Sequence, residues 1–248
     1  MKIINQKVEH LLLQSVEPET GNPAKRESLL ILGNAYGIMP YQVPLAEALA
    51  ERGFEPSWFA FSGQEGTGGS FDAQSVLHDV SVALNHIRTK RPNKPLSVIA
   101  HCMGGLIALE YLGRHQEEQS RFRKAIVYGL LFNPARRWKR AVPKLKKSGV
   151  NVGFTMEEAN YTPLKNLSSV NVPLLFCHAK DGLNLRRATA EELAMAVEAA
   201  PQAELAWFEK GYDRDLGRLP EFVEYYCHWL EQPVRIASEE KAHAEVGN

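Results

Sequence analysis

The stretch SVIAHCMGGLIALEY, residues 97–111, places a cysteine between an apolar run and a pair of glycines. The run up to Ala100 is continuously apolar, as in a parallel strand that is buried on both faces. From Gly104 onward, the apolar residues recur with the spacing of a helix. The sequence therefore predicts a strand that ends close to Cys102, a tight turn that needs small residues, and a helix that begins directly after the turn.

The rest of the chain repeats this alternation of short strand-like runs and helical patterns. Strands are predicted at 29–35, 56–63, 95–100, 124–132, 173–179 and 203–211, and helices at 43–53, 72–90, 104–115, 188–200 and 220–231. Such an alternation is typical of a mostly parallel sheet with helices on both faces. No internal repeat and no domain linker interrupts it, so we expect one domain over residues 1–232 and a disordered tail at 233–248.

Composition argues against several classes of protein. Lys plus Arg equal Asp plus Glu at 29 each, so the net charge gives no reason to expect nucleic acid or an anionic membrane as a partner. The three widely spaced cysteines suggest neither a disulfide framework nor a zinc site. No apolar run approaches the roughly 18 residues of a membrane span, and the first 15 residues do not resemble a signal peptide. We therefore expect a cytoplasmic globular protein with no cofactor and no metal.

Cys102 is a candidate nucleophile for a physical reason. In a doubly wound sheet, ligands collect at the carboxyl ends of the strands, and the predicted position of Cys102 is such an end. The helix that follows directs backbone N–H groups and the positive end of its dipole toward this residue. Both features stabilise the thiolate, which is the form of cysteine that attacks. The alternative is a buried and inert cysteine, a common environment for this residue type.

The segment AHCMGG, residues 100–105, resembles the nucleophile elbow G-x-S-x-G of the α/β-hydrolases, with alanine for the first glycine and cysteine for the serine. The resemblance extends in order over residues 25–232. It implies the α/β-hydrolase fold, in which residues 132–168 would form a short lid-like insertion. The segment ILGNAYG stands in the place of the family's H-G-x-G-G segment. The resemblance thus implies an oxyanion hole formed by the backbone N–H groups of Ala35 and Met103.

The family's catalytic acid has a match in the sequence, but its catalytic histidine does not. The segment PLLFCHAKDGLN resembles the one that carries the acid, and Asp181 is the matching residue. Alternatively, Asp181 is a turn residue that caps the next helix. His178 falls where many family members carry a structural residue. The family's histidine should follow the last strand, where Asp213 or Arg214 stands instead, and His101 is expected to point away from the cysteine. The sequence therefore does not contain a recognisable complete triad.

The missing histidine changes the chemistry that we expect. A few per cent of an ordinary cysteine is thiolate at pH 7, so acylation of Cys102 depends less on a base and is plausible without histidine. Hydrolysis of the acyl-thioester does depend on a base, because a general base contributes about 10²- to 10⁴-fold by activating water. One hypothesis is an esterase, thioesterase or acyltransferase that uses Cys102, with Asp181 as orienting acid. The other is a catalytically degenerate protein of the same fold with a binding or scaffold role.

A basic segment follows the predicted strand at 124–132. Seven of the twelve residues at 136–147 are Lys or Arg, and the first four are Arg136, Arg137, Lys139 and Arg140. The segment is either the solvated face of a helix or a docking site for phosphate, as in coenzyme A or on the acidic surface of an acyl carrier protein. In the second case Trp138 and Pro143 would give the docking site an apolar underside. The sequence does not indicate the acyl substrate, its acceptor or the oligomeric state.

Overall fold

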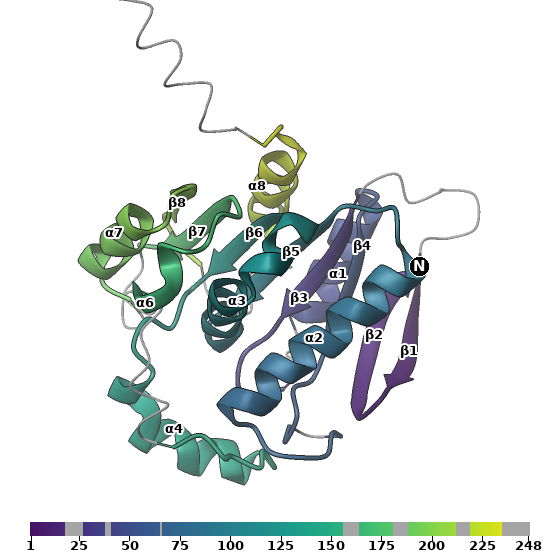
Figure 1. The fold of residues 1–248 in the computed structure, drawn as a ribbon, viewed down its shortest axis with the longest axis vertical. Coiled ribbons are helices and arrows are strands. Elements are labelled where there is room, and N and C mark those ends of the chain that lie inside the picture. Colours follow the sequence, from purple (N-terminus) through teal and green to yellow (C-terminus); the bar gives the residue numbers. More distant parts are fainter. Residues whose placement is uncertain are drawn as a thin grey trace, which may run out of the picture.

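The computed structural model describes residues 1–17, 27–37, 41–64, 66–155, 164–180, 188–211 and 219–234. Within these residues, eight strands form one sheet through the middle of the molecule (Figure 1). Their order across the sheet is β1-β2-β4-β3-β5-β6-β7-β8. The strands are β1 (Lys2–Val8), β2 (Leu11–Glu17), β3 (Ser28–Leu32), β4 (Glu55–Phe59), β5 (Leu96–His101), β6 (Phe122–Tyr128), β7 (Leu174–Ala179) and β8 (Ala203–Phe208).

The strands from β3 to β8 are mutually parallel, and β1 and β2 form an antiparallel hairpin at the edge of the sheet. This is the predicted mostly parallel sheet, and each predicted strand is present. Four of the predicted strands, at 29–35, 56–63, 124–132 and 203–211, extend past the observed carboxyl ends. Beyond β4 and β6 these residues include buried apolar side chains, such as Phe61 and Leu130, which made the loops look like continuations of the strands. Beyond β8 the residues Glu209 and Lys210 are exposed, and the predicted strand was simply too long there. The hairpin was not predicted, because β1 is half exposed and shows no regular alternation.

Helices cover both faces of the sheet (Figure 1). One face packs against α1 and α8, and the other packs against α2, α3 and α7. Helices α2 and α7 begin at side-chain caps: Asp72 accepts a hydrogen bond from the Ser75 N–H at the start of α2, and Thr189 and Glu192 form a capping box on α7. The helices are α1 (Gln42–Glu51), α2 (Ala73–Lys90), α3 (Met103–Arg114), α4 (Ala135–Lys147), α6 (Leu164–Leu167), α7 (Ala190–Ala199) and α8 (Pro220–Glu231), with a 3-10 turn at Gln116–Arg121.

The chain changes direction across the sheet between β3 and β5. From β3 it crosses to β4 on one side, and then returns past β3 to β5 on the other side. The loops that leave the carboxyl ends of β3 and β5 therefore diverge to opposite sides. In open parallel sheets such a switch point leaves a crevice in which ligands bind.

Helix α4 lies apart from the two layers of helices that cover the sheet (Figure 1). It follows β6 and is strongly amphipathic. Trp138 and Leu145 are buried, and the ring of Trp138 packs edge-on against Phe154. Lys139 and Arg140 are exposed, as are the lysines of its last turn. A lid at 132–168 stays a prediction, because 156–163 lie outside the described residues.

No helix in the described part of the chain combines the length and the apolar character that a membrane span requires. The tail predicted to be disordered begins at residue 233, and residues 235–248 lie outside the described residues. The three cysteines are all described, and they form no disulfide.

Candidate active site

Cys102 occupies a strained backbone conformation between β5 and α3. Its φ of 55° and ψ of −113° lie in a region that residues with a side chain rarely adopt. The turn is held by hydrogen bonds on both sides: the Cys102 N–H donates to the Tyr128 carbonyl at 3.0 Å, and the Cys102 carbonyl accepts from the Leu106 N–H at 3.4 Å. Strain of this kind persists only where the surrounding structure fixes it, and it is concentrated at functional sites. The predicted sharp turn at Cys102 is therefore present.

The two glycines after the cysteine are required by close packing. A Cβ on Gly104 would lie 2.6 Å from the carbonyl oxygen of Leu32 and closer still to that of Gly33. A Cβ on Gly105 would lie 2.7 Å from a methyl group of Val127. The absence of side chains lets the first turn of α3 approach the end of β3. This contact sets the distance between Cys102 and the loop that leaves β3.

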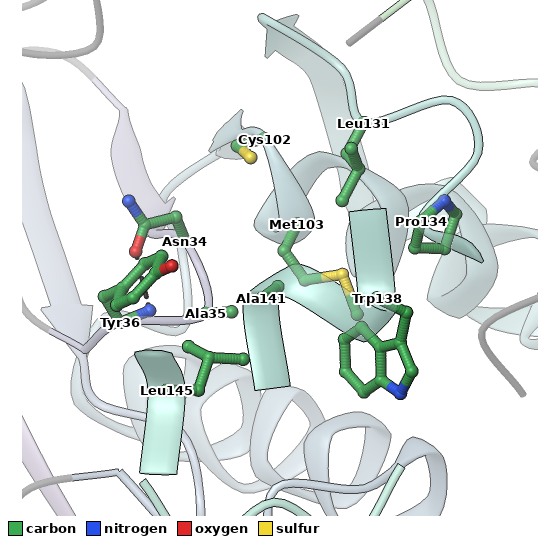
Figure 2. A pocket seen from close by; sticks show the side chains of 10 residues that line it. All are labelled: Asn34, Ala35, Tyr36, Cys102, Met103, Leu131, Pro134, Trp138, Ala141 and Leu145. Atoms are coloured by element: carbon green, nitrogen blue, oxygen red, sulfur yellow. Dashed lines mark hydrogen bonds between the residues drawn. The ribbon is translucent and has the colours of Figure 1, made fainter. Parts of the chain in front are cut away.

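The Cys102 side chain is half-buried and lines a pocket of about 160 Å³. Figure 2 shows the cysteine at the edge of this pocket, with Asn34 and Tyr36 on one side and Leu131 and Pro134 on the other. The remaining wall is apolar and comes from α3 and from the buried face of α4. The pocket is lined by Asn34, Ala35, Tyr36, Cys102, Met103, Leu131, Pro134, Trp138, Ala141 and Leu145.

Ala35 and Met103, the two predicted oxyanion-hole residues, line this pocket together with Cys102. Met103 is the first residue of α3, so its N–H is one of the donors that a helix leaves without an intrahelical acceptor. The loop that carries Ala35 is braced by Asn34. Its side chain accepts from the Tyr36 N–H at 2.7 Å, and its carbonyl accepts from the Gln64 side chain at 3.1 Å.

Tyr36 is a pocket residue that the sequence analysis did not identify. Burial, and to a smaller extent the charge of a Cys102 thiolate, raise the pKa of the Tyr36 phenol above its ordinary value. Tyr36 is 41% exposed, and its phenol is protonated at neutral pH. No motif indicates such a residue, because its position follows from the course of the β3–α1 loop and not from its sequence neighbours.

Two histidines lie near the carboxyl ends of strands, His101 on β5 and His178 on β7, and neither lines the pocket. His101 points to the opposite face of the sheet, where its Nδ1 is 2.7 Å from the Tyr41 hydroxyl and its ring stacks on Tyr128. His178 is fully buried, and its Nε2 accepts a hydrogen bond from the Leu130 N–H at 3.0 Å. The predicted direction of His101 is confirmed. None of the histidines in the described part of the chain lines the pocket.

The other predicted site residues are not brought into the pocket by the part of the chain that can be described. Asp181 lies outside the described residues, and so do Asp213 and Arg214. The side chains of Arg136 and Arg137 are not described either, although both residues belong to α4. Lys139 and Arg140 are exposed on α4, while the pocket is lined by Trp138, Ala141 and Leu145 on the other face of the same helix.

Comparisons with known proteins agree with this architecture. The sequence profile of the family described as serine aminopeptidase, S33, matches residues 38–156. An esterase from Exiguobacterium antarcticum superposes with a TM-score of 0.68 at 15% identity, covering 90% of this chain and 96% of the esterase. The thioesterase domain from the curacin biosynthetic pathway superposes with a TM-score of 0.64 at 13% identity, covering 94% and 99%.

The enol-lactonase from Burkholderia xenovorans is similar to the chain to the same degree, with a TM-score of 0.64 at 12% identity over 92% of this chain and 100% of the lactonase. No curated protein sequence matches the chain. The sheet order, the turn at Cys102 and these superpositions lead to one conclusion. The chain has the α/β-hydrolase fold.

Proposed function

We propose that this protein acts on acyl esters or thioesters, with Cys102 as the nucleophile. The observation that carries the proposal is the strained backbone of Cys102 at the start of α3, beside an apolar pocket. The neighbouring folds named as esterase, lactonase and thioesterase support the class of bond. A buried and inert cysteine would need neither the strain nor the opening to a pocket.

The proposed reaction begins with attack of the Cys102 thiolate on the carbonyl carbon of the acyl group. The new S–C bond pushes an electron pair onto the carbonyl oxygen, and this oxyanion accepts hydrogen bonds from the N–H groups of Ala35 and Met103. Each such donor stabilises the transition state by about 3 kcal/mol. When the oxyanion collapses, the bond to the alcohol or thiol breaks, and the leaving group takes a proton from water. The product is an acyl-thioester on Cys102.

The pocket limits the size of the acyl group. A cavity of about 150 Å³ accepts a ligand the size of benzene, so a pocket of about 160 Å³ suits an acyl chain of about six carbons. Its wall is mostly apolar, with Met103, Trp138 and Leu145 among the contacts. We therefore propose short to medium acyl groups as substrates, which fit better than long fatty acyl chains.

The second half of the reaction is expected to be slow with water. None of the described histidines reaches the pocket, so activation of water lacks its usual general base. An amine or thiol acceptor attacks a thioester without this help more readily than water does. The proposal therefore includes transfer of the acyl group to such an acceptor as well as slow hydrolysis. Asp181 as orienting acid stays part of the proposal.

Incubation with p-nitrophenyl hexanoate should give a burst of one equivalent of p-nitrophenol followed by slow turnover. The reason is that acylation needs only the thiolate, while deacylation needs a base. Intact mass spectrometry should show one added hexanoyl group, and peptide mapping should place it on Cys102. The dodecanoyl ester, whose acyl chain has twice as many carbons, is the matched comparison and should load more slowly.

Absence of an adduct from esters of every chain length would favour the second hypothesis, a catalytically degenerate protein of this fold. Turnover without a burst, at a rate equal to that of acylation, would show instead that a base is present.

The exposed face of α4 is a proposed docking surface for the phosphates of coenzyme A or for an acyl carrier protein. Lys139 and Arg140 are exposed on this helix, whose other face lines the pocket. A phosphate-bearing carrier bound there could direct its acyl end toward Cys102. Arg136 and Arg137 belong to the same proposal by their place in the sequence.

Neutralising this face with Lys139→Gln and Arg140→Gln should slow loading from hexanoyl-coenzyme A by about threefold to tenfold. The reason is that each side chain would lose an exposed ion pair with a phosphate, which contributes up to ~1 kcal/mol. Loading from the uncharged p-nitrophenyl ester should not change, and the difference should shrink at high salt. The matched control is Lys165→Gln. Lys165 is also an exposed lysine, but it is on α6 and not on α4. Equal effects on both donors would contradict a docking role.

A further inference from the structure

A cluster of possible metal ligands lies far from Cys102 in the sequence, where the β1–β2 hairpin meets α2. Glu9 and His10 form the turn between the two strands, and His78 is in the second turn of α2. One ligand atom from each of the three residues lies within 4.8 Å of the other two. None of the three lines the Cys102 pocket.

The distances within the cluster are slightly longer than those of a loaded site. Glu9 Oε2 is 4.0 Å from His10 Nδ1 and 3.8 Å from His78 Nε2. Ligands that each lie about 2.0 Å from a tetrahedral Zn²⁺ are separated by about 3.3 Å. The Glu9 and His78 side chains are each 61% exposed, so they can rotate inward by this amount without disturbing the core.

A second, independent observation is the environment of His10. Its Nε2 is 2.6 Å from Oδ1 of Asp79, a residue that is fully buried. Asp79 is itself held by the Ser62 N–H at 2.6 Å and by the Ser62 hydroxyl at 2.8 Å. A carboxylate only accepts hydrogen bonds, so Nε2 of His10 carries a proton, and in the neutral ring the lone pair is on Nδ1.

This is the arrangement that metal-binding histidines have: one ring nitrogen donates to a buried carboxylate, and the other binds the ion. In this protein the nitrogen with the lone pair is Nδ1, which is also the atom that faces Glu9. The rings of His10 and His78 lie parallel, with 10° between their planes and centroids 5.8 Å apart. Both imidazoles therefore reach the same side of the hairpin turn.

We propose that Glu9, His10 and His78 bind a divalent zinc ion, with Asp79 as the positioning residue for His10. Two imidazoles and one carboxylate are a ligand set that suits Zn²⁺, and the fourth position is left for water. The ion would join the edge hairpin to α2. The sequence did not indicate this site, because His78 is distant in sequence from Glu9 and His10. No cysteine belongs to the cluster, so the search for a zinc motif among the cysteines could not find it.

Zinc binding should be measured on the full chain without a polyhistidine tag, by equilibrium dialysis with ZnCl₂ and elemental analysis. The Cys102→Ala protein is used throughout, so that the reactive thiol does not contribute. We expect one equivalent of zinc, and an affinity lowered at least 100-fold by His78→Ala and by Glu9→Ala. Asp79→Asn should weaken binding by about 10- to 100-fold, as loss of an orienting carboxylate does.

The matched control is His86→Ala, because His86 is also on α2 and its Nε2 bonds to the Gln6 side chain of β1. This variant should keep one equivalent of zinc. Zinc should also raise the melting temperature of the protein with intact ligands, but not that of His78→Ala, since an ion that binds only the folded state stabilises it. The proposal would be overturned if the protein bound less than one equivalent of zinc at about 100 μM, a concentration that saturates all but weak sites. It would also be overturned if His78→Ala bound as much zinc as the protein with intact ligands.

Discussion

Replacing Cys102 by alanine is expected to abolish acyl loading from every ester and thioester donor. The proposed adduct is a thioester on this sulfur, and no other thiol can take its place. Cys177 is fully buried, and this burial raises the pKa of its thiol well above the ordinary value, so it stays protonated. Cys227 is also buried, on α8. The measurement is the burst of p-nitrophenol together with the intact mass after brief exposure to p-nitrophenyl hexanoate.

The serine variant separates the role of the thiolate from that of the pocket. Cys102→Ser keeps nearly the same shape, but a serine hydroxyl is not ionised at neutral pH and depends on a base, which contributes about 10²- to 10⁴-fold. Loading should therefore fall by at least about 100-fold. Cys177→Ala is the control and should load like the unmodified protein. An adduct that persists in Cys102→Ala would refute the assignment.

This pair of variants also distinguishes the two hypotheses that the sequence leaves open. If the protein is catalytically degenerate, the unmodified protein should form no adduct, and Cys102→Ala should leave its reactivity unchanged. If the strained turn serves a nucleophile, removing the sulfur removes the reaction, while the fold stays intact. The backbone strain at φ 55° favours the second outcome. This conformation costs free energy for any residue with a side chain, and such strain is concentrated at functional sites.

The fold could be predicted from the sequence because its signals are local. The buried parallel strands are continuous apolar runs, and the turn at Cys102 is marked by two glycines that packing requires. The β1–β2 hairpin escaped prediction because its edge strand is partly exposed, so that pairing and not patterning determines it. Local signals thus predicted the strands from β3 to β8 and missed the hairpin at the β1 edge of the sheet.

The site was predicted only where it depends on backbone. Ala35, Met103 and Cys102 line one pocket because their positions follow from the ends of β3 and β5, and their roles in catalysis stay predictions. Tyr36 and the Glu9, His10 and His78 cluster were missed, because such groups are assembled by tertiary contacts between distant segments. The basic run of α4 was recognised, but only the structure shows that its apolar face lines the pocket.

The second large effect is expected at Gly104, where no side chain can be accommodated. A Cβ there would meet the backbone carbonyl groups of Leu32 and Gly33, and it would not meet the end of a flexible side chain. Relief requires that α3 move away from β3. Gly104→Ala should lower the free energy of unfolding by about 3 kcal/mol, the upper part of the range for overpacked sites. Urea unfolding followed by circular dichroism measures this change.

Two other glycines make this prediction specific. A Cβ on Gly68 would meet nothing within 4 Å, so Gly68→Ala should change stability by less than about 0.5 kcal/mol. A Cβ on Gly105 would meet a methyl group of Val127, so the loss in Gly105→Ala should be partly recovered by Val127→Ala. No such recovery is expected for Gly104→Ala, because the added Cβ would meet backbone carbonyl groups, which no substitution can remove.

The same substitution should also impair the reaction more than the loss of stability explains. Gly33 is two residues before Ala35, so pushing α3 off the end of β3 separates the Met103 N–H from the Ala35 N–H. An oxyanion hole works only while both donors reach the same oxygen, and loss of one donor costs about 10²- to 10³-fold. Among folded molecules of Gly104→Ala, loading of Cys102 should fall by about this factor, while alkylation of Cys102 by iodoacetamide, which forms no oxyanion, should change little. Equal losses in both reactions would show that the thiol itself, and not the pair of donors, was disturbed.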